Sequence, residues 1–376
     1  MIVFSLNKNK HHLIIYSYSQ QLSPKMKQIN DIKKNLFFGF FFLSFIFSVF
    51  TPQKVHAAES KQSTIWKTEL HDFQLLEYKK NVELLFSAYE NKTQNSIAPT
   101  KTGRVALKID THSGEGLTTS KNLVRAIQNS LVKRGYEIQN IFLIDQDEQA
   151  IRKAGFLPPL SIGGNSFYGS PIIHSRSNEY YDDDWFYESP LPPHKSNALY
   201  FSAPERLQTK DNNTFDQSRR SLLAMPLIQN IDFWINLPVI TDHHKLRLNG
   251  ALINSSLWGI TNNQRFLNNT ASGQAAASEI AAIPELQENH RFTLVSLEKF
   301  QFIGGPNFNS RYTRSLPQLL LSEDMVAIDS IAVNIINTER KNAGFKPLKR
   351  PEQLNYANLL NLGNTDINKI AIQEIE

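Results

Sequence analysis

The sequence predicts an α/β fold with a mainly parallel sheet flanked by helices, and three observations carry that prediction. Residues 104–110 alternate as a strand does, and a helical apolar pattern follows over residues 123–131. Residues 136–145 are apolar enough for a second strand, so strand, helix and strand fall within about 40 residues. The apolar run 231–240 is long enough for one more buried strand. We therefore expect parallel strands joined by right-handed helical crossovers.

The elements around this first unit are read from spacing and from capping residues. Residues 59–100 have apolar side chains at near-helical spacing and predict a lead-in helix, with a loop after residue 91. In the first unit, Thr118 or Thr119 is suited to cap the helix, and Gly135 lies just past its end.

Residues 146–217 read as a long polar insertion. Within it, residues 180–187 combine three Asp with aromatic rings. Sugar stacking or Ca²⁺ binding is one interpretation of this segment, and a solvated loop is the other.

The second half of the chain returns to the pattern of strands and helices. We expect helices at 222–225 and 352–362, a helix capped by Ser322 that runs to about residue 339, strands at 228–240, 292–302, 319–322 and 370–375, and a loop or lid at 261–276. The strand at 370–375 is expected at the edge of the sheet.

The positive net charge of +5 comes from the leader rather than from the body of the chain. Seven of the 40 basic residues and one of the 35 acidic ones lie in residues 1–57, which leaves 33 basic and 34 acidic residues. A near-neutral body lacks the basic footprint that nucleic-acid binding requires, so we expect no nucleic-acid partner.

The same leader has the organisation of a secretory signal. Four lysines precede the 15-residue apolar run 36–50, and small residues follow at 57–58. We expect cleavage after Ala57 and no stable membrane anchor, because a membrane span needs about 20 apolar residues. Met26 would start a signal of conventional length, and nothing in residues 1–25 suggests a folded element. The domain boundaries are therefore 1–57 for leader and signal and 58–376 for a single α/β domain.

Cysteine is absent from the whole chain. This excludes disulfides, thiolate nucleophiles and Cys-ligated iron–sulfur clusters. Export without disulfides fits a bacterial periplasmic or secreted protein, and the leader lacks a twin-arginine pair, so Sec-type transport is expected.

Polar residues at the exits of the predicted strands are the candidate site. Asp242, His243 and His244 directly follow the most apolar strand, and a neutral imidazole beside a carboxylate can serve as a base or a metal ligand. Adjacent histidines point opposite ways in an extended segment, so one of the two should face a ligand. A loop histidine held by local hydrogen bonds is the alternative.

Two further strand exits carry similar residue types. Lys108, Asp110 and His112 follow at period two, so an extended chain would project all three to one face; a solvated strand edge is the alternative. The loop 114–116 (Gly-Glu-Gly) precedes a helix start and could hold a carboxylate or phosphate on backbone N–H groups, or could be a plain tight turn.

Two carboxylates near the start of a later helix have different expectations. Asp324 is expected in the first turn of the helix, where a negative charge interacts favourably with the helix dipole. Asp329 lies among apolar residues, so its carboxylate needs a hydrogen-bonding or charged partner.

Several of these landmarks, in this order, resemble the domain of unknown function family 362. They are 105–110 (Val-Ala-Leu-Lys-Ile-Asp), 118–120 (Thr-Thr-Ser), 236–243 (Asn-Leu-Pro-Val-Ile-Thr-Asp-His), 251–254 (Ala-Leu-Ile-Asn), 258–259 (Trp-Gly), 304–306 (Gly-Gly-Pro) and 322–329 (Ser-Glu-Asp-Met-Val-Ala-Ile-Asp). The resemblance covers about residues 100–376.

The chain departs from that family's usual pattern at several positions. The family's Lys-x-Asn reads Lys108-Ile109-Asp110 here, its Lys-x-His has Thr241 before His243, and its Lys-Asn pair is Ile253-Asn254. Many relatives carry a ferredoxin-type iron–sulfur module, which the cysteine-free chain cannot form. The resemblance implies no general biochemical role.

Two hypotheses follow. In the first, an exported α/β protein binds a small anionic or metal-associated ligand at the carboxyl edge of its sheet, and whether it is also an enzyme is open. Lys108, His243 and Asp329 would be the catalytic groups, with Lys108 supplying charge and His243 oriented by Asp242 or another carboxylate. The ligand-binding groups would be Asp110, Asp242, Asn254 and Asp324. In the second, the chain is a non-catalytic binding or envelope-interaction module whose contact surface is the aromatic and acidic insertion. The cofactor, the metal and the substrate are not specified by the sequence.

Overall fold

The computed structural model describes residues 3–6, 13–16, 62–189, 191, 219–267 and 270–376. The expected export signal, its cleavage site and the start at Met26 lie outside the described residues, as do residues 192–217 of the expected insertion.

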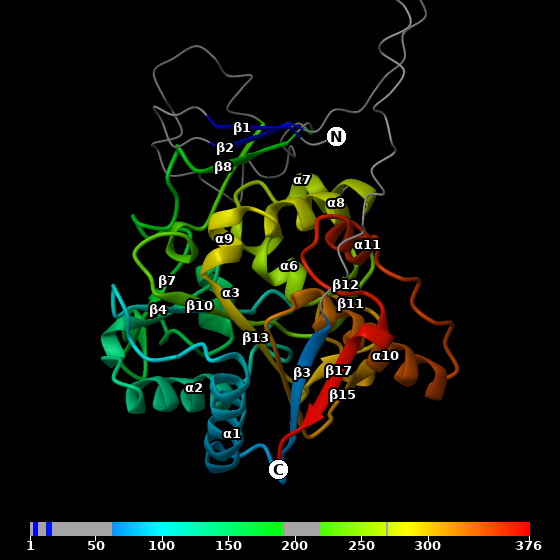
Figure 1. Ribbon diagram of the computed structural model, residues 1–376, viewed down its shortest axis with the longest axis horizontal. Coiled ribbons are helices and arrows are strands. Elements are labelled where there is room, and N and C mark those ends of the chain that lie inside the picture. The colour runs from blue at the N-terminus through cyan, green and yellow to red at the C-terminus, as the bar shows by residue number, and fades with distance from the viewer. Residues whose placement is uncertain (1–2, 7–12, 17–61, 190, 192–218, 268–269) are drawn as a thin grey trace, which may run out of the picture.

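A nine-stranded mixed sheet forms the centre of the molecule (Figure 1). Its order is β17-β3-β16-β13-β10-β4-β5-β7-β6. The strands are β3 (Ser63–Glu69), β4 (Val105–Ile109), β5 (Ile141–Ile144), β6 (Ser166–Phe167), β7 (Ser170–Ile173), β10 (Phe233–Leu237), β13 (His290–Ser296), β16 (Gln318–Ser322) and β17 (Ile370–Glu374).

Most neighbouring strands are parallel, which confirms the predicted fold class. Five of the eight neighbouring pairs are parallel and three are antiparallel. Among these nine strands, β16 and β6 run against the rest, so the carboxyl ends of the other seven share one edge. The closing strand β17 lies at the border of the sheet, as expected.

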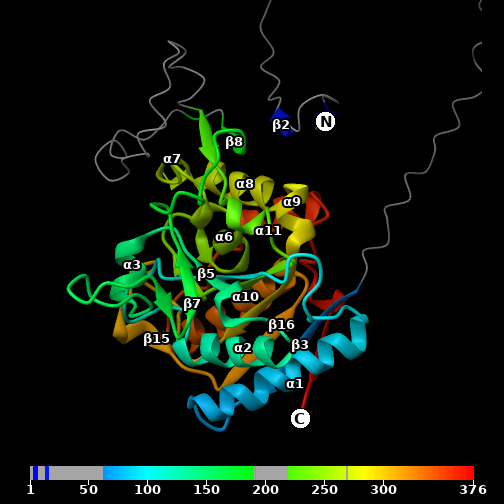
Figure 2. The ribbon, with the colours of Figure 1, turned by 90° about the vertical axis from the view of Figure 1, so that its left-hand side faces the viewer.

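Helices cover both faces of the sheet (Figure 2). One face carries α1 (Leu75–Thr93), α2 (Lys121–Lys133) and α3 (Glu148–Lys153), and the other carries α6 (Ala251–Ser255), α8 (Thr270–Ala281), α10 (Met325–Asn342) and α11 (Glu352–Leu359). The period-two alternation of the strands separates the two cores: Leu107 faces α1 and α2, whereas Ala106 faces the α6 side.

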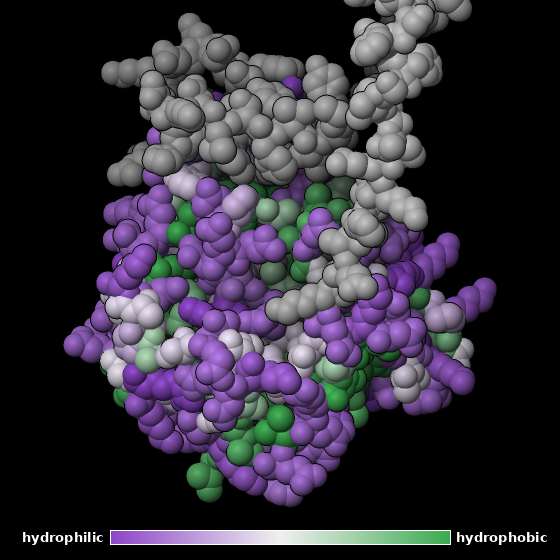
Figure 3. All heavy atoms as spheres, in the orientation of Figure 1, coloured by the Kyte–Doolittle hydropathy of each residue, from purple (hydrophilic) through white to green (hydrophobic). Residues whose placement is uncertain are grey.

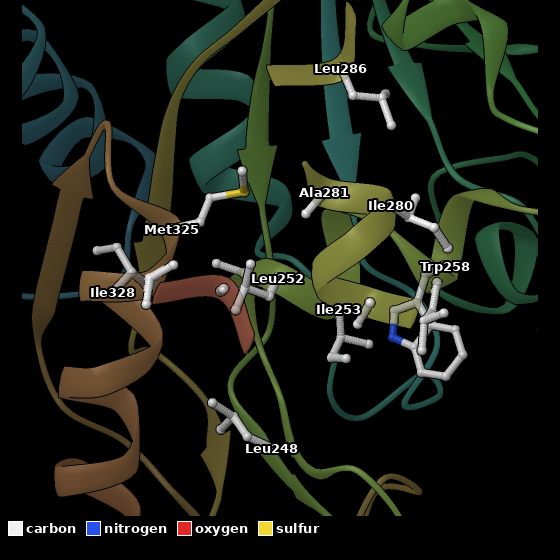
Figure 4. Packing of buried hydrophobic residues seen from close by; sticks show 14 of the residues in the cluster. Leu248, Leu252, Ile253, Trp258, Ile280, Ala281, Leu286, Met325 and Ile328 are labelled. Atoms are coloured by element: carbon white, nitrogen blue, oxygen red, sulfur yellow. The ribbon is translucent and has the colours of Figure 1, made fainter. Parts of the chain in front are cut away.

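The core on the α6 side is close-packed around α6 itself. Figure 4 shows Leu252 near Met325 and Ile328, and Ile253 and Ile280 beside Trp258. Every residue of α6 is buried, which fixes this short helix under the carboxyl edge of the sheet. On the outside, hydrophilic side chains cover most of the face seen in Figure 3. In the part of the chain that the structure describes, no helix combines the length and apolar character that crossing a bilayer requires.

Smaller sheets and short helices complete the fold. A four-stranded sheet has the order β12-β11-β14-β15, and two strand pairs are β8-β9 and β1-β2. Their bounds are β1 (Val3–Leu6), β2 (Leu13–Tyr16), β8 (Phe186–Glu188), β9 (Arg220–Leu222), β11 (Thr241–His243), β12 (Arg247–Asn249), β14 (Phe300–Gln301) and β15 (Thr313–Arg314). The remaining helices are α7 (Gln264–Leu267) and α9 (Pro284–Asn289).

The structure differs from the sequence prediction in several segments. The expected single strand at 292–302 is two strands, β13 in the main sheet and β14 in the four-stranded sheet. The lead-in region holds a sheet strand, β3, before its helix, because Ile65 and Trp66 are buried on opposite faces of the sheet and the strand pairs with β16 and β17. Residues 222–225 are not a helix but the end of β9 and the start of a short 3₁₀ turn. The expected loop at 261–276 contains α7 and much of α8, whose alanines favour helix. The leader, expected to hold no folded element, contains the pair β1-β2.

The expected insertion is also partly a component of the main sheet. Its first part supplies α3 and the strands β6 and β7, and β7 pairs in parallel with β5. The prolines and glycines of this segment made two short strands hard to predict, because β7 is paired by β5 and β6 only by β7.

Candidate functional site

A topological switch point lies between β4 and β10 at the carboxyl edge of the sheet. These two strands are parallel neighbours, and the chain leaves β4 toward β5 on one side and leaves β10 toward β13 on the other. In open α/β sheets, the crevice outside such a point is where ligands bind.

A crevice of about 370 Å³ lies at this point. Segments that follow β4, β10 and β13 line it, together with the end of α3. Its lining includes Glu115, Gly116, Thr118, Thr119, Ser120, Lys121, Asn122, Leu123, Lys153, Ala154, Gly155, Pro238, Val239, Ser296, Glu298 and Lys299. We call it the switch-point crevice.

The N-terminus of α2 opens into the switch-point crevice. Ser120 caps the helix and accepts a hydrogen bond from the backbone N–H of Leu123 at 3.4 Å. The backbone N–H groups of Lys121 and Asn122 have no partner within the helix, and the positive end of the helix dipole lies here. Together they favour an anion.

The expected cap residues, Thr118 and Thr119, are not the cap. Thr119 instead joins the exits of the two strands: its hydroxyl donates to the carbonyl of Leu237 at 2.7 Å, and it accepts from the N–H of Asp110 at 2.8 Å. It thereby fixes the width of the crevice between β4 and β10.

Three lysines border the switch-point crevice. Lys121, Lys153 and Lys299 are exposed, and among the described residues none of them forms an ion pair. The lining has two acids, Glu115 and Glu298, and the Glu298 carboxylate accepts a hydrogen bond from the Tyr78 hydroxyl at 2.8 Å. Three lysines against two carboxylates leave the lining with a net positive charge.

Lys108 lies on the other face of the same sheet edge and is completely buried. Its Nζ donates to Asp145 Oδ1, Asn254 Oδ1 and the carbonyl of Ile109, each at 2.9 Å. An ammonium group has three N–H donors, and all three are used. Lys108 therefore holds β4, β5 and α6 together and has no donor left for a ligand.

The partners of Lys108 are themselves fully engaged. Asp145 Oδ2 accepts from the N–H and the hydroxyl of Thr111 at 2.9 and 2.7 Å. Asn254 Nδ2 donates to Asn236 Oδ1 at 2.8 Å. The buried charges are thus paired and hydrogen-bonded, which is the condition under which such groups are tolerated in a core.

Asp110, Asn249, Trp258 and His112 form a closed ring of contacts at the carboxyl edge. Its Oδ2 accepts from Asn249 Nδ2 at 3.2 Å, and Asn249 Oδ1 accepts from Trp258 Nε1 at 2.6 Å. The His112 ring stacks on Trp258 with centroids 3.7 Å apart, and the backbone N–H of His112 donates to Asp110 Oδ1 at 3.0 Å. Burial and the nearby charge of Asp145 raise the pKa of Asp110 to about 6. Burial lowers the pKa of His112 to about 4, so its imidazole is neutral at pH 7.

His243 is a buried, neutral histidine with a fixed tautomer. Its Nδ1 accepts from the backbone N–H groups of Lys245 and Leu246, both at 3.1 Å. Burial and nearby positive groups lower its pKa to about 3, so the ring proton lies on Nε2. Nε2 is therefore a hydrogen-bond donor rather than a base or a metal ligand. Neighbouring His244 is exposed, as the alternation of the two histidines predicted, although the two rings lie parallel with centroids 5.0 Å apart.

The expectation that Asp242 orients His243 is wrong. Asp242 Oδ1 accepts from the N–H of Gly305 at 2.8 Å, and its Oδ2 lies 3.7 Å from Arg340 Nη1. Local backbone N–H groups orient the imidazole instead, because the turn after β11 brings them directly to Nδ1.

The loop 304–308 contacts two segments: the one with His243 and His244, and the loop that follows β4. The carbonyl of Gly305 accepts from the N–H of His244 at 3.4 Å, and the N–H of Phe308 donates to the carbonyl of Ser113 at 2.8 Å. The Phe308 ring lies over Gly116, where a Cβ would overlap it. This close approach explains a glycine at position 116.

Asp329 and Asp324 act as helix caps. Asp329 is buried and accepts from the N–H groups of Ala251 and Leu252 at 2.6 and 3.0 Å, which satisfies the start of α6. Burial raises its pKa to about 7. The cap of α10 is Asp324, which accepts from the N–H of Ala327 at 2.8 Å and also binds Ser63. The expectation that Ser322 caps this helix is wrong: its hydroxyl accepts from the N–H of Asp324 at 3.1 Å, before the helix begins. Asp324 borders a separate hollow of about 650 Å³.

The structure thus brings together part of the predicted set. Lys108 and Asn254 are in direct contact, and Asp329 caps the helix that carries Asn254. Asp110 is linked to Trp258 through Asn249, and the His243 ring lies 6.3 Å from Trp258 between ring centroids. Asp242 and Asp324 point to other partners. The sequence did not single out the lysines of the switch-point crevice, although the run 118–121 (Thr-Thr-Ser-Lys) after a glycine turn was a signal for them.

The aromatic residues of the insertion point inward. Tyr180 is fully buried, and Tyr187 donates a hydrogen bond to Glu279, while Asp182, Asp183 and Asp184 are exposed. This arrangement agrees with a solvated acidic loop anchored by its rings. Within the described part of the chain, no group of three or more His, Cys, Asp or Glu residues could hold a metal ion.

Comparisons with known proteins name no relative. No family model matches the chain, and no curated protein matches it. One solved structure with partial similarity is the crystal structure of a protein from Thermotoga maritima, a target of the Northeast Structural Genomics Consortium, with a TM-score of 0.36 and 11% identity. The match covers 73% of this chain and 60% of that one. A likeness of this size supports no conclusion on fold or function.

Proposed function

We propose that this chain is an exported binding protein for a small anionic ligand, which it holds in the switch-point crevice. The observation that carries the proposal is the meeting of the α2 N-terminus with Lys121, Lys153 and Lys299 at the carboxyl ends of β4 and β10. Free backbone N–H groups, a helix dipole and unpaired lysines all favour a negative charge at the same point.

The residues that were expected to be catalytic form structural hydrogen bonds near this site instead. Lys108 has no free donor, and the carboxylate of Asp329 accepts from two backbone N–H groups. Asp110, expected to bind the ligand, accepts from the N–H of Val239 instead. His243 retains one free donor, Nε2–H, on the α6 side of the edge. The proposal is therefore ligand binding, without a chemical step.

The test is equilibrium binding of inorganic phosphate and of citrate to the full chain by calorimetry. We expect binding that weakens as salt is added, and a loss of about tenfold in Lys121→Ala, because a hydrogen bond to a charged group contributes about 1.5 kcal/mol or more. Lys349→Ala, which removes an exposed lysine outside the crevice, is the matched control and should bind as the wild type does. Failure of both anions to bind, or equal binding by Lys121→Ala, would overturn the proposal.

Export belongs to the same proposal and rests on the leader sequence. Expression of the full chain in a bacterium should yield a protein that begins at Ala58 in the periplasm or medium. Intact protein with its leader in the cytoplasm would contradict it.

Kinship with the domain of unknown function family 362 is also proposed. It is supported by the ordered motifs and by the contact between Lys108 and Asn254, two residues from separate motifs. A solved structure of a family member should contain the equivalent lysine and asparagine side chains in contact, and their separation there would argue against kinship.

A further inference from the structure

A larger groove adjoins the switch-point crevice. It has a volume of about 1040 Å³, in the range of small-molecule sites, and lies between α2, α3, the segment after α3 and the β6-β7 hairpin. Figure 2 shows α2, α3 and β7 on the same side of the molecule. Lys121, Asn122, Lys153 and Gly155 line both spaces, so the two hollows adjoin each other along these four residues.

The groove combines positive charge with exposed apolar surface. Five basic side chains line it, and its one acid, Glu148, is already paired with Arg152 at 2.8 Å and with Arg176 at 3.1 Å. Leu160 on the opposite wall is 77% exposed. A cavity of this kind matches a ligand that is both anionic and apolar.

One wall is a platform for a flat ring. Tyr168 is 63% exposed, and the guanidinium of Arg125 lies 4.1 Å from its ring centroid, while Phe167 contacts the ring edge. The Arg125 cation covers one face of the Tyr168 ring and, with the Phe167 contact, restricts the ring, and Tyr168 forms part of the groove lining. A pre-oriented aromatic ring next to a cation stacks planar groups at little entropic cost.

Because the crevice and the groove adjoin, we infer that the ligand of the switch-point crevice is an anion that carries a planar aromatic ring and extends across their shared border. The anionic group occupies the crevice at the α2 N-terminus, and the ring lies in the groove against Tyr168. Lys121, whose Nζ lies over Gly155 at the junction, contacts the anionic end. This inference rests on the proposed function and adds the class of ligand.

The test compares 2-naphthyl phosphate with inorganic phosphate on the full chain. The wild type should bind the aromatic phosphate about ten times more tightly, since stacking of one ring contributes of that order. Tyr168→Asn should abolish this gain and leave the affinity for inorganic phosphate unchanged. Asparagine tolerates the positive φ of 49° at this position, so the backbone is kept. Phe345→Ala, at an exposed ring outside the groove, is the control and should keep the gain.

The outcomes separate the two proposals. If neither phosphate binds, the proposed function fails. If inorganic phosphate binds in a manner that depends on Lys121, but the naphthyl group adds no affinity or Tyr168→Asn retains the gain, the anion site stands and the aromatic ligand class is wrong. Melting temperatures of all variants confirm that they are folded.

Discussion

Replacement of Lys108 by Met tests whether this buried lysine is a structural tie or a ligand-binding group. Lys108→Met removes three hydrogen bonds of 2.9 Å and leaves the carboxylate of Asp145, whose side chain is 6% exposed, without its counter-charge. Loss of one partner of a buried ion pair costs about 3–5 kcal/mol, a large part of the stability of a typical domain.

The matched control is Lys67→Met. Lys67 pairs with Glu374 at 2.6 Å, but the Glu374 side chain is 65% exposed, so this loss should be at most about 1 kcal/mol. Urea unfolding, followed by circular dichroism, measures the free energy of unfolding of both variants. Equal m-values show that the two free energies can be compared. In the folded Lys108→Met variant, phosphate affinity should stay within about twofold of the wild type, because Nζ lies on the α6 side of the sheet. The structural role of Lys108 would be refuted if Lys108→Met lost as little unfolding free energy as Lys67→Met. It would also be refuted if folded Lys108→Met no longer bound phosphate.

Three further predictions follow from the site. The ¹⁵N shifts of His243 should report the Nε2–H tautomer and show no titration above pH about 5, because its pKa is lowered to about 3; a midpoint near 6.5 would contradict this. Gly305→Ala should lower the free energy of unfolding, measured by thermal unfolding, by more than about 2 kcal/mol, because a Cβ there would overlap the carbonyl oxygen of Asp242. Gly344→Ala, at a positive φ in open space, should cost about 1 kcal/mol, and equal losses would argue against the packing of the loop 304–308 on Asp242. Asp329 has a pKa raised to about 7, so the native state holds this proton more tightly than the unfolded chain, and its contribution to stability is full below pH about 4 and is lost as the pH rises to about 7. Asp329→Asn should therefore flatten the pH dependence of the unfolding free energy in this window, and an unchanged slope would show that Asp329 does not titrate there.

The parallel core of the fold was predictable because its signals are local. The alternation in β4, the apolar face of α2 and the apolar run of β10 each depend on a few neighbouring residues, and the structure contains all three. The strands β3, β6 and β7 were missed because their hydrogen bonds come from strands that are distant in sequence or from very short pairings. The helix α8 was missed because a segment rich in Ser and Ala reads as a loop when its buried face is unknown.

The candidate site was likewise only partly predictable from the sequence. That Lys108 and Asn254 meet could be expected from strand exits that share one edge. That all three donors of Lys108 are already used could not be expected, because their acceptors are brought together only in the folded structure. The role of Asp242 was misassigned for a similar reason: adjacency to His243 in sequence suggested a pair, while the turn after β11 supplies closer backbone donors.

The central claim is that an anion binds where the N-terminus of α2 meets the carboxyl ends of β4 and β10. The most direct measurement is amide chemical-shift mapping of the full chain during titration with inorganic phosphate. The account predicts that the largest shifts occur at the amides of Ser120, Lys121 and Asn122, with Val239 across the crevice also affected. Saturable shifts centred on another region, with these four amides unchanged, would contradict it.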